Sequence, residues 1–226
     1  ASGLELPAAV IVETVQVHGG VHVASVAWLK ELEKLCREFE ILLIVDETHT
    51  GCGRVGPYFS FEIAGLDPDM VVVPNAIGGG LPMSVLLLRP ELDFWRPGEQ
   101  VGTFQGDSLA FVAATELLSQ WSDARSKTVE RYSAMLAQEL SAFAIRFPNR
   151  AVGVRGKGMI WGVDLGRPGS AAVVSAWALE RGLIVEPARL RDEVLLVLPA
   201  LTIDESILRE GLSRLAQVVS AFLSHD

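Results

Sequence analysis

Three short apolar runs in the first third of the chain constrain its fold more than any other feature. They are AAVIVET (8–14), ILLIVDE (41–47) and MVVVPN (70–75), and each is dense in valine, isoleucine or leucine without polar alternation. Continuous runs of this kind are typical of strands that are covered on both faces in a parallel sheet. The sequence therefore predicts an α/β fold with a mostly parallel sheet.

A helical pattern connects the first two runs. From Ser25 to Glu38 apolar residues recur at steps of three and four, after a serine suited to capping a helix. Strand, helix and strand with short joints form the right-handed crossover unit of an α/β sheet, in which ligands bind at the carboxyl ends of the strands. That rule singles out three pairs of residues: Glu13-Thr14, Asp46-Glu47 and Pro74-Asn75.

The later part of the chain has a different pattern. A fourth apolar run, 83–89, is expected to return antiparallel, and helical patterns follow at 109–121 and 128–147. Beyond them, strand and helix patterns occur in the order β-β-α-β-β-α. We therefore expect residues 1–125 to form part of a large α/β domain with helices on both faces of its sheet. Residues 126–226 are expected to form a small α+β domain that includes the connecting helix.

The composition restricts the possible partners. The 226 residues are half apolar and carry a formal net charge of -9, from 19 basic and 28 acidic residues. No cluster of lysine and arginine interleaved with aromatic residues occurs, so neither nucleic acid nor membrane is expected as a partner. No basic segment precedes the first apolar run, no apolar stretch reaches the ~20 residues of a membrane span, and two cysteines are too few for a disulfide framework. These features predict a cytoplasmic protein.

Four side chains near the predicted strand ends are candidates for acid–base chemistry on a small-molecule ligand. Asp46 and Glu47 end a strongly apolar strand, where an unpaired buried carboxylate is costly, so Asp46 is expected to face a ligand or an internal cation. The alternative is that Asp46 only caps the following loop. His49 follows three residues later, and His18 lies in HGGVH (18–22). The spacing of the histidines fits no standard zinc pattern, and we expect no metal.

Several longer blocks resemble one family. They are AAVIVETVQ (8–16), LLIVDETHTGCGRVGPYFSFEIAGLDPDMVV (42–72), IGGGLP (77–82), GTFQGDSLAFVAA (102–114), VRGKGMIWGVDL (154–165) and VLPALTIDESILREGL (197–212). In order and over nearly the whole chain, these blocks resemble the class III (ω-amino acid) aminotransferases on the type I pyridoxal-phosphate fold, in particular the diaminobutyrate–2-oxoglutarate aminotransferases. The block DE-x-x-TG-x-GR-x-G is quite specific.

The resemblance implies roles for two of these positions. Asp46 would hold the protonated pyridine nitrogen of the cofactor. Thr103 would hold the phosphate of the neighbouring subunit's cofactor, because active sites in this family lie at a dimer interface. A homodimer is therefore expected, and the open edge and apolar face of half a sheet point the same way.

The sequence departs from the family pattern at positions that face the cofactor. Asn75 stands where the family has the Schiff-base lysine, and an amide can neither form that link nor shuttle a proton. His49 replaces a glutamine, and Val17-His18 replaces a Gly-Glu pair. Chains of the family are about twice as long, so the resemblance implies that the N-terminal half of the fold is missing from this sequence.

These departures lead to three hypotheses. The first is a degenerate aminotransferase that is not competent for ordinary transamination. It would use the four acid–base side chains for cofactor-independent cyclisation, isomerisation or elimination on a small metabolite. Asp46 and Thr103 would then be vestigial cofactor positions, and no cofactor is expected. The second is a non-catalytic partner subunit, or one half of a split diaminobutyrate-type aminotransferase whose other half comes from a hetero-partner. The third is a protein that binds pyridoxal phosphate without a covalent link. The sequence favours the first.

Overall fold

The computed structural model describes residues 5–99, 102, 106–147, 152–189 and 191–225. Contacts between residues divide the chain into two compact units. The first unit contains Ala1–Thr14, Ala24–Gly53 and Pro57–Ser126, and the second contains Val15–Val23, Arg54–Gly56 and Lys127–Asp226. The division into domains 1–125 and 126–226 stays a prediction. Two short segments from the first half of the chain, Val15–Val23 and Arg54–Gly56, also belong to the second unit.

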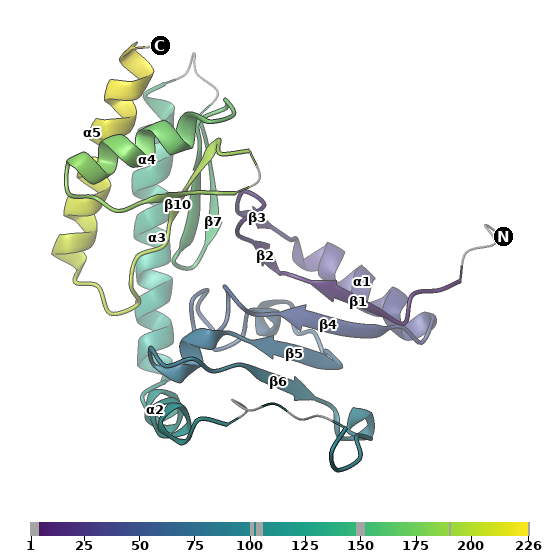
Figure 1. Cartoon of the computed structure of the whole chain (residues 1–226). Helices are drawn as coiled ribbons and strands as arrows, with labels where there is room; N and C mark the ends of the chain where they lie inside the picture. The colour runs from purple at the N-terminus through teal and green to yellow at the C-terminus, as the bar shows by residue number, and fades with distance from the viewer. Residues whose placement is uncertain (1–4, 100–101, 103–105, 148–151, 190, 226) are drawn as a thin grey trace. The chain divides into compact units, whose positions relative to one another are not determined.

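The first unit is built on a four-stranded sheet. Its strands are β1 (Ala9–Val12), β4 (Leu42–Asp46), β5 (Met70–Val73) and β6 (Val85–Leu88), in that order across the sheet (Figure 1). β1, β4 and β5 are parallel, and β6 is antiparallel to β5. The three apolar runs therefore form parallel neighbours, and the fourth returns antiparallel, as the sequence predicts.

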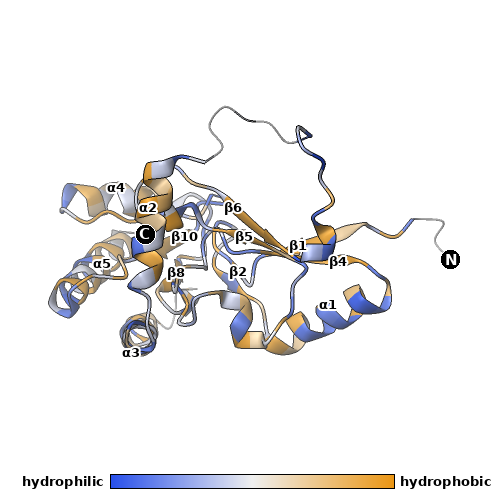
Figure 2. Ribbon diagram, turned by 90° about the horizontal axis from the view of Figure 1, so that it is seen from below, coloured by the Kyte–Doolittle hydropathy of each residue, from blue (hydrophilic) through white to orange (hydrophobic). Residues whose placement is uncertain are grey.

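Helix α1 (Val26–Glu38) covers one face of this sheet. It begins where the sequence predicts, because the Ser25 hydroxyl accepts a hydrogen bond from the Trp28 N–H at 3.2 Å. Leu29 on the inner side of the helix packs with Val45 of β4 and with Leu66 in one buried cluster. Figure 2 shows α1 alongside the strands, with its hydrophilic side turned away from them. The crossover unit inferred from the sequence is thus present.

A buried carboxylate ties the amino ends of the central strands to α1. Asp69, directly before β5, accepts hydrogen bonds from Arg37 of α1 at 2.8 and 2.9 Å and from the Leu43 N–H at 2.7 Å, and it is paired with Arg89. Burial alone would raise the pKa of Asp69, but the Leu43 N–H and the two arginines outweigh it and lower that pKa. This network stabilises the edge of the sheet opposite to the predicted ligand edge.

Short helical turns and one α-helix complete the described part of the first unit. They are η1 (Ser60–Ala64), η2 (Asn75–Gly78), η3 (Pro90–Leu92) and α2 (Ser108–Ser119). The Asp107 carboxylate caps α2 by accepting the N–H groups of Leu109 and Ala110. Ala114 of α2 packs with Ile77 of η2 and Val73 of β5, so α2 lies against the segment that follows the third parallel strand.

The second unit has an antiparallel sheet with helices around it. Its strands β7 (Gly153–Lys157), β8 (Ile160–Asp164), β10 (Val194–Val197) and β9 (Glu186–Pro187) follow one another across the sheet. Helices α3 (Asp123–Ile145), α4 (Ser170–Glu180) and α5 (Glu205–His225) supply much of its apolar core. The β-β-α-β-β-α order agrees with the prediction. Among the described residues, no helix is long and apolar enough to cross a membrane.

A small hairpin from the first half of the chain joins the second unit. It consists of β2 (Val15–Gln16) and β3 (His22–Val23), with a turn between them. Val21 in this turn is fully buried and packs in a cluster with Ile160 of β8, and Arg155 Nε of β7 donates to the Gly20 carbonyl at 2.6 Å. The sequence analysis does not predict these strands, since each strand is only two residues long.

Candidate functional site

The three parallel strands bring the predicted residue pairs to one edge of the first sheet. Val12 of β1 lies opposite Val45 of β4, and Asp46 lies opposite Val72 of β5. Thr14, Asp46 and Asn75 therefore all follow the carboxyl ends of neighbouring parallel strands. Ligand sites of open α/β sheets lie at this edge, so the edge is the candidate site.

Asp46 is held by the residue two positions later. Its Oδ1 atom accepts the Thr48 N–H at 2.9 Å and also the Thr48 hydroxyl, which fixes the plane of the carboxylate in an Asx turn. Among the described residues, the second oxygen, Oδ2, has no hydrogen-bond partner. The carboxylate is half-buried at the end of a central strand. A fixed, half-buried carboxylate with one remaining acceptor fits a cationic N–H donor such as a protonated pyridine.

Glu47 points away from Asp46, because successive side chains of a strand alternate between its two faces. Its side chain is fully buried, at 0 % exposure. Oε1 accepts the Ser60 hydroxyl at 2.7 Å and the Phe61 N–H at 3.1 Å, and Oε2 accepts the Thr50 hydroxyl. The Ser60 hydroxyl is in turn hydrogen-bonded to Thr14. Glu47 thus connects the ends of β1 and β4 with η1.

The buried environment also changes the acidity of Glu47. Burial raises the pKa of its carboxyl above the ordinary value, although the donors from Thr50, Ser60 and Phe61 act in the opposite direction. The backbone carbonyl of Glu47 accepts the N–H groups of Thr50 and Gly51 at 3.1 and 2.9 Å. The side-chain carboxylate and the backbone carbonyl of Glu47 therefore both hold the tight turn that follows Asp46.

Asn75 lies at the entrance of η2, directly after β5, and its side chain is exposed. Pro74 precedes it and packs closely on the turn after β4, because a Cβ atom on Gly51 would lie 2.9 Å from the Pro74 ring. Gly79, in the left-handed conformation at φ 62°, ends η2. The glycine-rich turn thus begins at Asn75, in the position that the sequence predicts for a reactive residue.

The segment after Asp46 is closely packed. His49 is half-buried in the turn, and the Cys52 sulfur lies 3.6 Å from the Tyr58 hydroxyl. Burial raises the pKa of Tyr58. Gly53 has a φ of 82°, and a Cβ atom there would lie 1.9 Å from the Trp121 ring. Only glycine fits at this position, which explains the glycine of the GCG segment without a phosphate-binding role.

The predicted site residues do not all fall within one unit. Asp46, Glu47, His49 and Asn75 belong to the first unit, whereas His18 lies in the hairpin turn of the second unit. Thr103 lies outside the described residues. A common pocket for His18, Asp46 and His49 therefore stays a prediction. The described residues contain no group of three or more His, Cys, Asp or Glu side chains placed to hold a metal ion.

Sequence reasoning missed Thr48 and Ser60 as supports of the site, and it singled out Thr14 only as a residue at a strand end. The Asp-x-Thr spacing signals the Asx turn that holds Asp46, and it was available from the sequence. Ser60 gave no such signal, because its hydrogen bonds to Glu47 and to Thr14 form only through the fold. Thr48 thus holds the Asp46 carboxylate, and Ser60, itself bonded to Thr14, holds that of Glu47.

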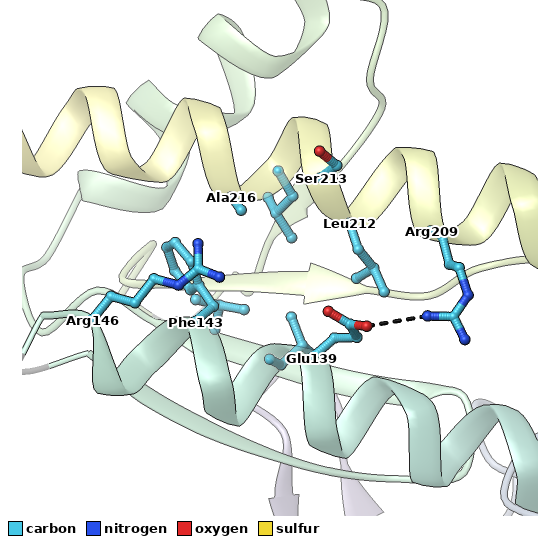
Figure 3. Close-up of a pocket in the computed structure, with 10 residues that line it drawn as sticks. Glu139, Phe143, Arg146, Arg209, Leu212, Ser213 and Ala216 are labelled. Atoms are coloured by element: carbon cyan, nitrogen blue, oxygen red, sulfur yellow. Dashed lines mark hydrogen bonds and ion pairs between the residues drawn. The ribbon is translucent and has the colours of Figure 1, made fainter.

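A separate cavity of about 270 Å³ lies in the second unit, between α3 and α5 (Figure 3). The pair Glu139 and Arg209 spans its mouth at 3.1 Å, and Arg146 and Phe143 lie further along α3. None of the predicted site residues lines this cavity. Because the ion pair is about half exposed, it contributes little to stability. The carboxyl edge of the first sheet remains the candidate site.

Comparison with known proteins connects this edge to a family. The family model described as "Aminotransferase class-III" matches residues 5–219. The chain belongs to the class-III aminotransferases. The family match includes Asp46 at the end of β4 and Asn75 after β5. The resemblance inferred from the sequence blocks is therefore confirmed.

Individual relatives define how much of a class-III aminotransferase is present. The chain is 48% identical, over 98% of its length, to a diaminobutyrate–2-oxoglutarate transaminase of Wolinella succinogenes, and it covers 52% of that relative. The crystal structure of N-acetylornithine aminotransferase from Stenotrophomonas maltophilia is similar at a TM-score of 0.84 and 31% identity, with 97% of this chain and 58% of that chain covered. The chain thus spans about half the length of the curated relatives that it matches.

These comparisons correct the expectation that no cofactor binds. An ornithine aminotransferase structure from Toxoplasma gondii, described as having partial occupancy of PLP at its active site, matches at a TM-score of 0.84 and 28% identity, covering 96% of this chain and 52% of that chain. Membership in the class-III aminotransferases points to pyridoxal phosphate. The expectation rested on Asn75 and on the N-terminal half that the resemblance implies is missing, and the family membership outweighs both. The geometry of Asp46 fits the pyridine nitrogen of this cofactor.

Proposed function

We propose that this chain is part of a diaminobutyrate-type class-III aminotransferase that takes pyridoxal phosphate at the carboxyl edge of its first sheet. The observation that carries the proposal is Asp46: Thr48 fixes one oxygen, and the other has no partner among the described residues. A carboxylate held in this way is suited to a protonated ring nitrogen. The identity of 48% to the Wolinella succinogenes transaminase supports this type of aminotransferase.

The chain's own residues would orient the cofactor and restrict its chemistry. When bound, pyridoxal phosphate supplies an electron sink for the removal of a proton beside an amino group. Asp46 would keep the ring nitrogen protonated and fix the ring against the end of β4. The exposed Asn75 side chain would donate or accept hydrogen bonds at the start of η2, but it provides neither a covalent attachment nor a base.

Ordinary transamination needs a group that both attaches the cofactor and moves the proton, and Asn75 supplies neither function. We therefore infer that this site, by itself, is not competent for exchange of amino groups. The bound cofactor would instead support proton-transfer chemistry, such as elimination, cyclisation or isomerisation, on a small amino compound. His49, half-buried in the turn after Asp46, is the nearest candidate base along the chain, and His18 is a further candidate.

Glu47 does not belong to the acid–base set in this proposal. Its carboxyl is completely buried and accepts hydrogen bonds from two hydroxyls and one N–H. A group with no access to solvent and with its acceptors engaged is suited to anchoring the turn. We assign Glu47 to holding the Asp46 segment in place.

The proposal is tested by trapping and mass spectrometry. The purified chain and its Asn75→Lys variant are incubated with pyridoxal phosphate, reduced with borohydride and digested. We expect a reduced adduct at residue 75 of the variant only, and non-covalent retention of the cofactor by the unreduced original chain. An adduct on another lysine of the original chain, or no adduct on the variant, would contradict the proposed geometry.

A second candidate function is a partner subunit in a split aminotransferase. Its support is that the chain spans 52% of the Wolinella succinogenes relative, so half of that fold has no counterpart in this sequence. Such a subunit would contribute Asp46 to a site completed by another polypeptide or by a second copy. Supplying the remaining half in trans tests this candidate, which expects the two polypeptides together to bind the cofactor more tightly than this chain binds it alone.

A further inference from the structure

The cavity between α3 and α5 lies within the second unit and shares no residue with the candidate site (Figure 3). Its lining comes mainly from two stretches of equal length, residues 139–146 along α3 and residues 209–216 along α5. Each stretch covers about two helical turns, so each helix turns one face toward the cavity. Strand β8 lies beneath them and contributes Val163.

The floor of the cavity is apolar. Val163 is fully buried, and Leu140, Phe143 and Leu215 are at most 5 % exposed. Ala216 of α5 also lines the cavity, and it carries only a methyl group where a longer side chain would fill the space between the helices. Such a floor favours a ligand with a hydrocarbon body, because apolar surface on both sides is removed from water.

The mouth of the cavity carries charge. The Arg209 guanidinium is engaged, because it donates to Glu205 at 2.9 and 3.0 Å and to Glu139 at 3.1 Å. Arg146, directly after α3, is different: in the part of the chain that the structure describes, its guanidinium has neither an ion pair nor a hydrogen bond. Figure 3 shows the Arg146 side chain extending from α3 toward α5, across the cavity. Arg146 is therefore the group at this mouth that can receive an anion.

The charge of the lining indicates which kind of anion fits. Two arginines and one glutamate give the lining one formal positive charge, in a chain whose net charge is -9. A carboxylate balances that charge and matches the planar fork of the Arg146 guanidinium. A phosphate group, with a charge of about −1.5 to −2 near pH 7, exceeds it and would be repelled by Glu139. A single carboxylate thus fits the mouth better than a phosphate.

The size of the cavity limits the rest of the ligand. A volume of about 270 Å³ holds roughly nine groups of the size of a water molecule, at ~30 Å³ each. We propose that the cavity between α3 and α5 binds a small monocarboxylate with an apolar body, which places its carboxylate on Arg146 and its body over Leu140, Phe143 and Val163. This inference goes beyond the proposed function and does not depend on it, because the lining residues all belong to the second unit.

Calorimetric titration of the purified chain, without pyridoxal phosphate, tests the class of ligand. Phenylacetate is the probe, 2-phenylethanol has the same ring without the charge, and acetate and inorganic phosphate have charge without the ring. We expect saturable one-to-one binding of phenylacetate and at least tenfold weaker binding of 2-phenylethanol, because the alcohol lacks the charge-assisted pair with Arg146. Acetate and phosphate should not compete at the same concentrations.

Arginine variants test where the carboxylate binds. Arg146→Gln should raise the dissociation constant of phenylacetate about tenfold or more. Arg189→Gln is the matched control, because Arg189 is also exposed and belongs to the same unit but does not line the cavity; its dissociation constant should stay unchanged. Arg146→Lys keeps the charge but loses the planar fork, so its affinity should lie between those of Arg146→Gln and the original chain.

Two further measurements test where the apolar body binds. Ala216→Leu should abolish binding of phenylacetate, because the larger side chain would occupy the cavity, and circular dichroism checks that the variant folds. In methyl NMR spectra of the original chain, phenylacetate should shift the signals of Leu140 and Leu215. The signals of Leu43, which is buried in the first unit, should stay in place.

Four results would overturn the proposal. One is the absence of phenylacetate binding, and another is binding of 2-phenylethanol as tight as that of phenylacetate. The third is an equal effect of Arg146→Gln and Arg189→Gln on the dissociation constant, which would leave Arg146 only the role of complementing the helix dipole at the end of α3. The fourth is a set of methyl shifts confined to the first unit.

Discussion

Replacing Glu47 tests the physical account of the candidate site most sharply within the chain itself. Glu47→Ala removes the acceptor of the Ser60 and Thr50 hydroxyls and of the Phe61 N–H, all of them in buried surroundings. Each unsatisfied buried donor costs about 1–3 kcal/mol, although hydroxyls can turn to other acceptors. We therefore expect the free energy of unfolding to fall by roughly 3–6 kcal/mol in Glu47→Ala.

Glu47→Gln should behave differently. The amide oxygen can replace Oε1 as acceptor for Ser60 and Phe61, and its NH₂ group can donate to the Thr50 oxygen, so the loss near neutral pH should stay within ~1 kcal/mol. The variant also removes a titrating group. Because burial raises the pKa of Glu47 in the folded chain, the protonated carboxyl is favoured by folding.

The sign of the pH dependence follows from this shift. The stabilisation linked to the raised pKa is fully present below the unfolded pKa and is lost as the pH rises through the folded pKa. The original chain should therefore lose stability relative to Glu47→Gln as the pH rises above the ordinary range of a glutamate carboxyl, by at most ~1.4 kcal/mol per pH unit. Urea denaturation at several pH values measures the difference, and the exposed Glu62→Gln is the control. A difference that grows in favour of the original chain with rising pH would refute the reasoning.

Three further substitutions test the packing of the first unit. Asp69→Asn should lower the free energy of unfolding by about 1–3 kcal/mol near neutral pH. Because folding lowers the pKa of Asp69, the stabilisation by this carboxylate is lost as the pH falls through its folded-state pKa, and the variant should be less sensitive to acid. Urea denaturation at acidic and neutral pH checks both expectations. Gly53→Ala should lower the free energy of unfolding by more than ~2 kcal/mol, because the new Cβ atom would collide with the Trp121 ring. Gly80→Ala has open space at its Cβ and should cost only the ~1–2 kcal/mol of its left-handed backbone. Equal losses for the two variants in calorimetry would contradict the structure. Ser25→Ala should remove the cap of α1 at a cost of ~1 kcal/mol in thermal unfolding, and an unchanged midpoint would speak against the cap.

The arrangement of the site was predictable where it depends on local pattern. Apolar runs that end in polar residues gave the parallel strands, and the carboxyl-edge rule then grouped Asp46 with Asn75. The alternation of a strand places Asp46 and Glu47 on opposite faces, but the sequence does not say which face is buried. That outcome depends on Ser60 and Thr14, which approach Glu47 only after the chain has folded.

The interleaving of the two units could not be predicted for the same reason. The hairpin that holds His18 follows β1 directly in sequence, yet its buried Val21 packs with Ile160, and Arg155 holds its turn. These contacts join residues more than a hundred positions apart, and no periodicity signals them. Asn75 after the third parallel strand was visible in the sequence, but it did not reveal that the family points to a cofactor.

The most direct test of the central claim is equilibrium dialysis of pyridoxal phosphate against the original chain and Asp46→Asn, each alone and with the remaining half of the Wolinella succinogenes relative. The account predicts that the original chain binds the cofactor non-covalently and that Asp46→Asn weakens binding roughly tenfold or more, because the partner of the charged ring nitrogen is lost. No binding to the original chain in either form, or equal binding by Asp46→Asn, would contradict it.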